Sequence, residues 1–303
     1  VLGNPFKAAE DRGVYRTVDG GKSWTKVLYV DPDTGASDVA LDPNNPRVLF
    51  AGTWQTRRQP WGHTSGGPGG GLWRSADGGD TWKRIEGKAS GLPGGEWGKV
   101  GVTISPADSS RIYALIEAEE GGLFRSNDGG KSFKRINDHQ VLRQRAWYYT
   151  TITPHPTDPN VLWMPQVRML RSIDGGKSVQ SVPGFFHGDH HDIWIDPSNP
   201  QRMISGSDGG VDLSVDGGAS WFHPRLPLAQ FYNIDVDQRT PYHVGGTMQD
   251  FGTATGPSMS LLGGTAPLTE WQVAGGGEAG DFKYDRGLPG VAYAGEYSGY
   301  LSR

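Results

Sequence analysis

The segment HGDHHD, from His187 to Asp192, places three histidines and two aspartates within six positions. Imidazole and carboxylate groups bind divalent metals, and they exchange protons near neutral pH. The segment therefore offers three alternatives: a metal site, an acid/base cluster, or a polar loop that holds only water. Which alternative applies depends on the elements that position these side chains.

If the segment is extended, the side chains of His187, Asp189 and His191 point to one side and offer three nitrogen and oxygen ligands to a divalent metal ion. No cofactor is required by the sequence, because adjacent histidines also occur in polar loops without a metal. Glycoside hydrolysis instead needs two carboxylates on either side of the scissile bond. Asp189, Asp192 and Asp208 are candidates for that pair, and His191 is a candidate to share the acid role. The alternative for these carboxylates is a solvated acidic rim.

The composition excludes several classes of protein. A net charge of -4 shows no basic excess, so the sequence predicts neither a nucleic-acid partner nor binding to an anionic membrane. Cysteine is absent, which excludes disulfides and thiolate metal sites. No apolar run approaches the ~20 residues that span a bilayer, so no membrane insertion is expected. The 47 glycines and 21 prolines indicate a chain rich in tight turns. Since the chain starts at Val1, we expect it to be a fragment of a longer one.

An internal repeat organises the sequence. The pattern S/T-x-D-G-G-x-S/T-aromatic occurs five times, with Val179 as the one departure at the last position. We call these segments the DGG turns and expect each to be a hairpin turn. Its aspartate accepts backbone N–H groups, its glycines take positive φ, and its aromatic ring fills the space between neighbouring units. The aspartates are accordingly structural: Asp19, Asp77, Asp128, Asp174 and Asp216.

A second motif alternates with the first, in segments such as LDPNNPRVLFAG from Leu41 and IDPSNPQRMISG from Ile195. Each unit then has four short strands, which is typical of a propeller blade. The sequence predicts an all-β fold, a single β-propeller domain over 1–303 that most closely fits seven blades. The blades are expected at about 1–30, 37–86, 97–137, 146–182, 189–224, 230–274 and 279–303.

The parity of the strands places the DGG turns at one end of each blade and the long crossover loops at the other. HGDHHD lies in a crossover, so it is expected at the channel mouth. Asp192 belongs there to a column shared by the inner strands: Asp38, Gly101, Thr151, Asp192, Asn233 and Asp281. We expect ligand-binding side chains on the same end, in the histidines of HGDHHD and in three other loops: His187, His190, Trp54, Arg57, Trp61, Gln249, Asp250 and Glu296. Asp208 is expected there too, in SDGGVD.

The strings HGDHHDIWIDPSNPQRMISGSDGG and QPWGHTSGGPGGGLWRSADGGDTW resemble the bacterial BNR or Asp-box repeat proteins, which are glycosyl hydrolase-like or sortilin-like propellers related to xyloglucanases and sialidases. The resemblance covers essentially the whole chain. It implies a secreted or periplasmic protein, with a second propeller or further domain of the full-length chain as a possible partner. Xyloglucanases place two catalytic aspartates between two propellers, and no position here is matched to that pair.

Two functions follow from these observations. The first is an exported glycoside hydrolase-like propeller that acts on or binds a glycan at the channel mouth. The second is a non-catalytic propeller that binds proteins or peptides, as sortilin-like receptors do. The sequence leaves open whether the chain is an enzyme, and if it is one, it predicts a glycoside hydrolase.

Overall fold

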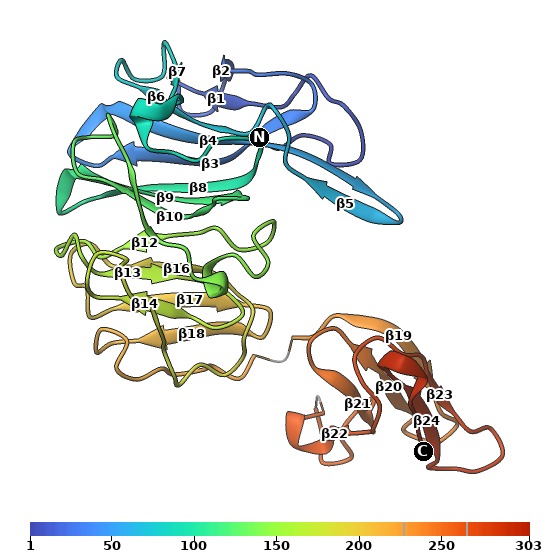
Figure 1. Ribbon diagram of the computed structural model, residues 1–303. Coiled ribbons are helices and arrows are strands. Elements are labelled where there is room, and N and C mark those ends of the chain that lie inside the picture. Colours follow the sequence, from blue (N-terminus) through green and yellow to red (C-terminus); the bar gives the residue numbers. More distant parts are fainter. Residues whose placement is uncertain (227, 265) are drawn as a thin grey trace. The chain divides into compact units, whose positions relative to one another are not determined.

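The computed structural model is built almost entirely of β-strands (Figure 1), and it describes residues 1–226, 228–264 and 266–303. The chain divides into two compact units, Val1–His223 and Pro224–Arg303. The strands form seven antiparallel sheets within the described residues. The all-β propeller class predicted from the repeat is therefore confirmed, and four of the sheets described below have the four consecutive antiparallel strands of a full blade.

The first unit contains five sheets, which Figure 1 shows stacked face to face in chain order. The first sheet has two strands, β1 (Val14–Arg16) and β2 (Thr25–Leu28). The second runs β3 (Thr34–Asp42), β4 (Asn45–Gln59), β6 (Gly71–Ser75) and β7 (Lys83–Arg84), with β5 (Gly62–Ser65) paired to β4. The third runs β8 (Trp97–Ser105), β9 (Asp108–Ala118), β10 (Gly122–Ser126) and β11 (Lys134–Asn137).

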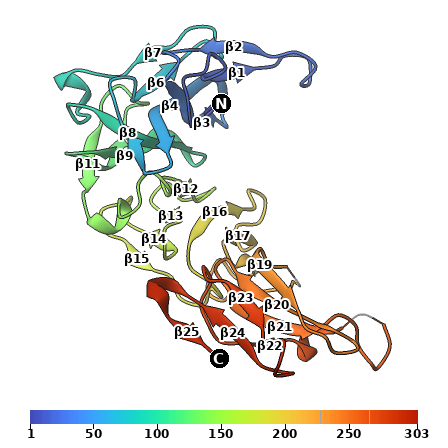
Figure 2. The same cartoon turned by 90° about the vertical axis from the view of Figure 1, so that its right-hand side faces the viewer.

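The fourth sheet is formed by β12 (Thr153–Pro154), β13 (Leu162–Met164), β14 (Leu170–Ser172) and β15 (Gln180–Ser181), which follow one another in Figure 2. The fifth consists of β16 (His190–Ile195), β17 (Met203–Ser207) and β18 (Gly210–Ser214). Its fourth strand is reduced to a single bridge between Leu213 and Phe222.

The second unit contains two sheets. One has four strands: β19 (Phe231–Val236), β20 (His243–Met248), β21 (Gly252–Pro257) and β22 (Gln272–Val273). The other has three: β23 (Phe282–Tyr284), β24 (Ala292–Gly295) and β25 (Leu301–Ser302).

Helical structure in the described residues is confined to short 3-10 turns. They are η1 (Lys88–Ser90), η2 (Gln140–Leu142), η3 (Leu268–Glu270) and η4 (Tyr297–Gly299). Within the described ranges, no helix has the length and apolar character needed to cross a membrane.

The DGG turns have the predicted hydrogen bonds. In the first one, Asp19 accepts from the backbone N–H of Ser23 at 2.9 Å and from the Ser23 hydroxyl at 2.6 Å, while Thr17 donates to the same carboxylate at 2.7 Å. These donors hold the pKa of Asp19 at about 2, well below its usual value. Both glycines of the turn have positive φ, 73° for Gly20 and 90° for Gly21. The four later turns repeat this arrangement.

The aromatic residue of the DGG turn fills the space between sheets in only part of the repeat. Phe133 is buried, and Trp82 and Trp221 pack against buried clusters. Trp24 departs from the prediction, because 60% of its surface is exposed. Its sheet has only two strands, β1 and β2, so fewer neighbours surround the ring.

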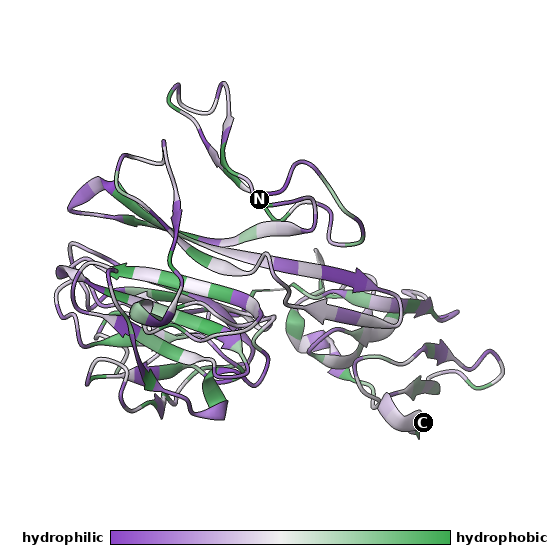
Figure 3. Cartoon of the chain, turned by 45° about the horizontal axis from the view of Figure 1, so that its top comes forward, coloured by the Kyte–Doolittle hydropathy of each residue, from purple (hydrophilic) through white to green (hydrophobic). Residues whose placement is uncertain are grey.

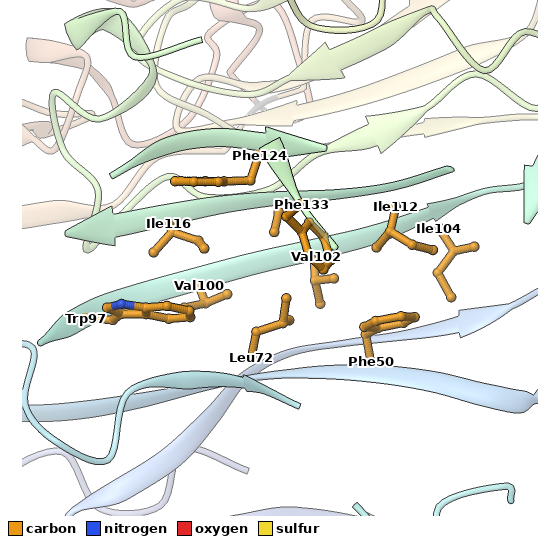
Figure 4. Packing of buried hydrophobic residues seen from close by; sticks show 11 residues of the cluster. Phe50, Leu72, Trp97, Val100, Val102, Ile104, Ile112, Ile116, Phe124 and Phe133 are labelled. Atoms are coloured by element: carbon orange, nitrogen blue, oxygen red, sulfur yellow. The ribbon is translucent and has the colours of Figure 1, made fainter. Parts of the chain in front are cut away.

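The largest core cluster lies between the second and third sheets (Figure 4). Phe50 of β4 and Leu72 of β6 face Val102 and Ile104 of β8, and all four are buried. Figure 3 shows hydrophobic residues concentrated on the strands and hydrophilic ones on many connecting turns. Burial of these apolar surfaces is the dominant stabilising term, about 25 cal/mol for each Å² removed from water.

Inner strands β3, β16 and β19 share an irregularity near their first residues. In each of them a β-bulge interrupts the pairing at one residue. This residue is Ser37 in β3, His191 in β16 and Tyr232 in β19. Each of these residues directly precedes a member of the column that the inner strands share, which we call the polar column: Asp38, Asp192 or Asn233. A bulge inserts an unpaired residue and redirects its side chain, and such bulges often flank functional sites. We call this end of the inner strands, opposite the DGG turns, the mouth end.

Candidate functional site at the mouth end

HGDHHD connects β15 to β16 and ends inside β16. Backbone bonds fix its course: the N–H groups of Asp189 and His190 donate to the carbonyls of Val167 and Gln166, at 3.0 and 2.9 Å. The N–H of Asp208 donates to the carbonyl of Asp189 at 3.2 Å. The segment is thus tied to the β13–β14 loop and to the β17–β18 turn.

The segment is not extended throughout, contrary to the condition set for the metal site. Asp189 has a φ of 53°, in the left-handed region, and His191 occupies the bulge in β16. Left-handed backbone costs on the order of 1–3 kcal/mol outside glycine, so its surroundings must hold Asp189 in place. The simple alternation of side chains is therefore lost, and His190 is buried while its neighbour His191 is exposed.

The Asp189 carboxylate is held by two side chains from the segment before β12. The Tyr149 hydroxyl donates to its Oδ1 at 2.5 Å, and the Arg145 guanidinium lies 3.4 Å from the same oxygen. Burial raises the pKa of Tyr149 well above its usual value, and the bond to Asp189 raises it further. Tyr149 therefore stays protonated and serves as a permanent donor to the carboxylate.

His191 forms the centre of an aromatic and acidic cluster. Its Nε2 atom lies 2.6 Å from Oδ1 of Asp208, in the two-residue turn between β17 and β18. Its ring contacts Tyr148 edge-on, with centroids 5.2 Å apart, and Tyr149 at 5.5 Å. About 40% of the His191 side chain remains exposed. The pair therefore presents a hydrogen-bonded imidazole to solvent, next to two tyrosines.

The other two histidines have different surroundings. His190 is 2% exposed, packs edge-on against Phe185, and has its Nδ1 3.2 Å from the Ser205 hydroxyl. Burial lowers the pKa of His190 to about 4, so the ring is neutral near pH 7. His190 is thus a core residue, and the ligand-binding role that the sequence predicted for it does not fit its burial. The His187 side chain lies over Gly209. A Cβ atom added at Gly209 would come within 2.3 Å of the His187 Cβ atom.

The residues proposed as metal ligands do not fit one ion. His191 is directed to Asp208, and Asp189 is directed to Tyr149 and Arg145. No group of three or more His, Cys, Asp or Glu side chains is gathered for a metal in the described part of the chain. No chemistry is therefore assigned to a metal at His187, Asp189 and His191.

A second group of charged residues lies on the inner strands β3 and β8. Asp38 accepts the N–H of Val102 at 2.9 Å and that of Val39 at 2.8 Å. Burial raises the pKa of Asp38, and the two hydrogen bonds oppose this by stabilising the ionised carboxylate. The nearby negative charge of Asp192 also raises the pKa. Burial lowers the pKa of Lys99, which the charge of Asp38 opposes.

Lys99 connects this group to the aromatic cluster. Its Nζ donates to the carbonyl of Tyr148 at 3.0 Å and lies 5.6 Å from the centre of the Trp54 ring. The Asp192 carboxylate is exposed and accepts only the N–H of the next residue, Ile193, at 2.8 Å among the described contacts. Inner strands β3, β8 and β16 thus bring Asp38, Lys99 and Asp192 to one electrostatically coupled region of the mouth end.

The aromatic loop expected around Trp54 is largely a β-hairpin, formed by the outer part of β4 and β5. Trp54 is 6% exposed and donates its indole N–H to the Ser65 hydroxyl, so it is unavailable for stacking on a sugar. Arg57 is paired with Asp33. Trp61, at the hairpin tip, is 81% exposed and can act as a platform.

The remaining predicted residues belong to the second unit. Gln249 donates its N–H to Gln230, and Asp250 has a φ of 63° with its N–H 2.5 Å from Glu278. Tyr297 also donates to Glu278, and this bond raises the pKa of Tyr297 to about 12. Glu296 donates its N–H to Tyr300. Asp250 and Tyr297 thus share the Glu278 carboxylate, which the sequence did not single out.

Comparison with known proteins identifies relatives of the sequence. No protein-family model matches the chain. Xyloglucanase Xgh74A of Acetivibrio thermocellus is 26% identical over 254 residues, which cover 69% of this chain and 28% of that enzyme. A xyloglucanase of a Paenibacillus species is 32% identical over 158 residues, covering 50% of this chain and 14% of its own length. The chain is thus similar in sequence to xyloglucanases, and it spans less than a third of their length.

Two solved structures are similar at a coarser level. The GH74 xyloglucanase of Xanthomonas campestris aligns with 88% of this chain and 51% of its own, at 16% identity and a TM-score of 0.46. YCF48 bound to D1 peptide aligns with 86% of this chain and 76% of its own, at 14% identity and a TM-score of 0.45. Likeness at this level says nothing about function.

Proposed function

We propose that this chain is part of an exported glycoside hydrolase-like protein and that the mouth end of its first unit holds a glycan. The similarity to xyloglucanases over 254 residues supports a glycan as the ligand. The observation that carries the proposal is the contrast between two carboxyl groups of the mouth end, Asp38 and Asp192, which influence each other electrostatically. They occupy equivalent column positions on β3 and β16, and one carboxyl group has a raised pKa while the other is exposed.

Hydrolysis of a glycosidic bond uses two carboxyl groups of different pKa, one protonated and one ionised. Because burial favours the protonated form of Asp38, this residue is suited to donate a proton to the leaving oxygen. Asp192 is suited to accept a proton from the water that attacks the anomeric carbon. Asp208 orients the His191 imidazole toward the same region, and Asp189 fixes Tyr149 and the loop before β16. In this proposal Asp189, Asp208 and His191 position the sugar next to Asp38 and Asp192.

The test is hydrolysis of xyloglucan oligosaccharides and of a panel of β-glucans by the protein. We expect Asp38→Asn and Asp192→Asn to lower the rate of release of reducing ends by about 10²-fold or more, the usual contribution of a general acid or base. Asp80→Asn is the matched control, because Asp80 is a surface carboxylate in a DGG turn, paired with Arg16. Equal losses in all three variants, or full activity of the first two, contradict the assignment.

A specific observation favours the alternative of a non-catalytic binding propeller. Both oxygens of Asp38 already accept backbone N–H groups, and Asp189 and Asp208 are engaged by neighbouring side chains. These hydrogen bonds favour the ionised carboxylates, which suits a site that binds a ligand without transferring a proton to it. Isothermal titration calorimetry separates the two functions: saturable binding of oligosaccharides with no products after long incubation supports the binding module.

Export to the periplasm or the exterior is part of the proposal, in line with the glycan as ligand. We also propose that a second propeller or further domain of a longer chain adjoins the mouth end. Fractionation of the producing cells tests the first statement. Crosslinking of the full-length protein at Trp61, which is exposed at its hairpin tip, tests the second.

A further inference from the structure

The fourth DGG turn differs from the others in its last residue. Trp24, Trp82, Phe133 and Trp221 occupy this position elsewhere, and Val179 occupies it here. Trp82 and Trp221 lie against the second glycine of their own turns, Gly79 and Gly218. The corresponding Gly176 is covered by the aliphatic side chains of Leu123 and Ile136. The space that an aromatic ring takes up in those two turns is therefore not filled by the turn's own side chain.

A groove of about 600 Å³ opens at this place, between η2 and the outer strands of the fourth sheet. Its apolar lining includes Val167 and three residues that belong to or pack against one buried cluster: Val141, Leu170 and Val179. Asn137 closes one end, since its amide donates to the carbonyls of Gly176 and Lys177 at 3.1 and 3.2 Å. The groove is thus built into the first unit and is about large enough for a ring-bearing side chain with its neighbours.

The ionisable side chains that line the groove are all basic among its described residues. His139, Arg168 and Lys177 line the groove, and no Asp or Glu does so among its described residues. Arg168 and Lys177 are both exposed, and neither side chain is ion-paired within the described part of the chain. The lining also contains no Trp, Tyr or Phe among the same residues, so it lacks the ring on which a sugar would stack.

We propose that this groove binds an acidic peptide segment that carries one aromatic side chain. The aromatic ring enters the space over Val179 and rests on Val141 and Leu170. Carboxylates on either side of it pair with Arg168 and Lys177, as acidic motifs are recognised by clusters of basic side chains. This site lies on residues that the proposed glycan site does not use, so either proposal can fail without the other.

The test uses a short fluorescent peptide with one tryptophan flanked by aspartates and glutamates. Fluorescence anisotropy is expected to show saturable binding that weakens between about 50 mM and about 500 mM NaCl, because salt screens exposed charges. A peptide with alanine for tryptophan, and one with lysines for the acidic residues, are each expected to bind at least about tenfold more weakly.

Two variants and one matched control test the location. Val179→Trp restores the aromatic residue of the repeat and is expected to abolish binding without lowering Tm. Lys177→Glu is expected to weaken binding about tenfold, whereas Lys131→Glu, at the same position of the preceding DGG turn, leaves it unchanged. If Val179→Trp lowers Tm, the comparison of Lys177→Glu with Lys131→Glu decides alone.

Three results overturn the proposal. The first is the absence of saturable binding of the acidic tryptophan peptide. The second is equal weakening by Lys177→Glu and Lys131→Glu, which shows nonspecific attraction. The third is binding of an oligogalacturonate in place of the peptide, with loss of that binding in Lys177→Glu, which assigns the groove to an acidic glycan.

Discussion

The Nε2 atom of His191 lies 2.6 Å from Oδ1 of Asp208, and this contact joins the bulge of β16 to the turn between β17 and β18. A second contact, between Tyr149 and Asp189, holds the residue two positions earlier. The start of β16 is therefore fixed by side chains on both sides, and their removal has distinguishable effects.

We expect Asp208→Asn to change ligand binding more than stability. The His191–Asp208 pair is partly exposed, and such pairs contribute about 0–1 kcal/mol to folding. The loss of the carboxylate leaves the imidazole without its orienting charge. Urea unfolding and calorimetry with xyloglucan oligosaccharides provide the two measurements. A loss of stability well above 1 kcal/mol with unchanged binding would assign the pair to the fold alone.

Tyr149→Phe is expected to lower the free energy of unfolding by about 1–3 kcal/mol, because it leaves the Asp189 carboxylate without its buried donor. The neighbouring Tyr148→Phe is the matched control, since Tyr148 is 46% exposed and shares only ring contacts with His191 and Tyr149 through its side chain among the described residues. Chemical denaturation of both variants measures the difference. Equal stability of the two variants speaks against the role given to the Tyr149 hydroxyl.

The stability of the protein is expected to fall as the pH drops from about 6.5 to about 4, in part through His190. The folded pKa of His190 is about 4, and an unfolded histidine titrates near 6.5. Between these values the unfolded chain binds a proton that the folded chain does not, so acid favours unfolding. His190→Asn should flatten the dependence of Tm on pH in this window. An NMR titration of the His190 ring with a midpoint near 6.5 contradicts the prediction.

Asp216→Asn is expected to lower Tm near neutral pH and to weaken the loss of stability below about pH 4. Hydrogen bonds from Ser220 and Ser214 hold the folded pKa of Asp216 at about 2. Its stabilising effect is therefore complete above the unfolded value near 3.8 and is lost as the pH falls toward 2. Asp80→Asn, in another DGG turn, controls for the loss of a surface charge. Identical acid transitions of the two variants exclude a special role for Asp216.

Local chemistry explains what could be read from the sequence. The DGG turns need only residues within eight positions, and their hydrogen bonds and positive φ values agree with the prediction. The link between HGDHHD and Asp208 followed from strand parity, which brings the start of β16 next to the β17–β18 turn.

The contacts of the candidate site that join different sheets could not be predicted from the sequence. The coupling of Lys99 with Asp38 and Tyr148 joins residues far apart in the chain, although Asp38 stood in the polar column of the sequence. The sequence RAWYY, residues 145–149, lies before the fourth inner strand, and its cluster of aromatic residues indicates the position of Tyr148 and Tyr149 at the mouth end. The bulge at His191 and the left-handed Asp189 broke the expected alternation, because periodicity assumes a regular strand.

The bulge at the start of β3, β16 and β19 has a consequence for how this protein can change over generations. Its extra residue is unpaired, so the amino acid there can be exchanged while the column and the core behind it keep their register. Ser37, His191 and Tyr232 thus occupy equivalent positions in three sheets and carry three different side chains. A repeat protein of this kind can acquire a new ligand one sheet at a time, by substitution at single sites, without rebuilding its scaffold.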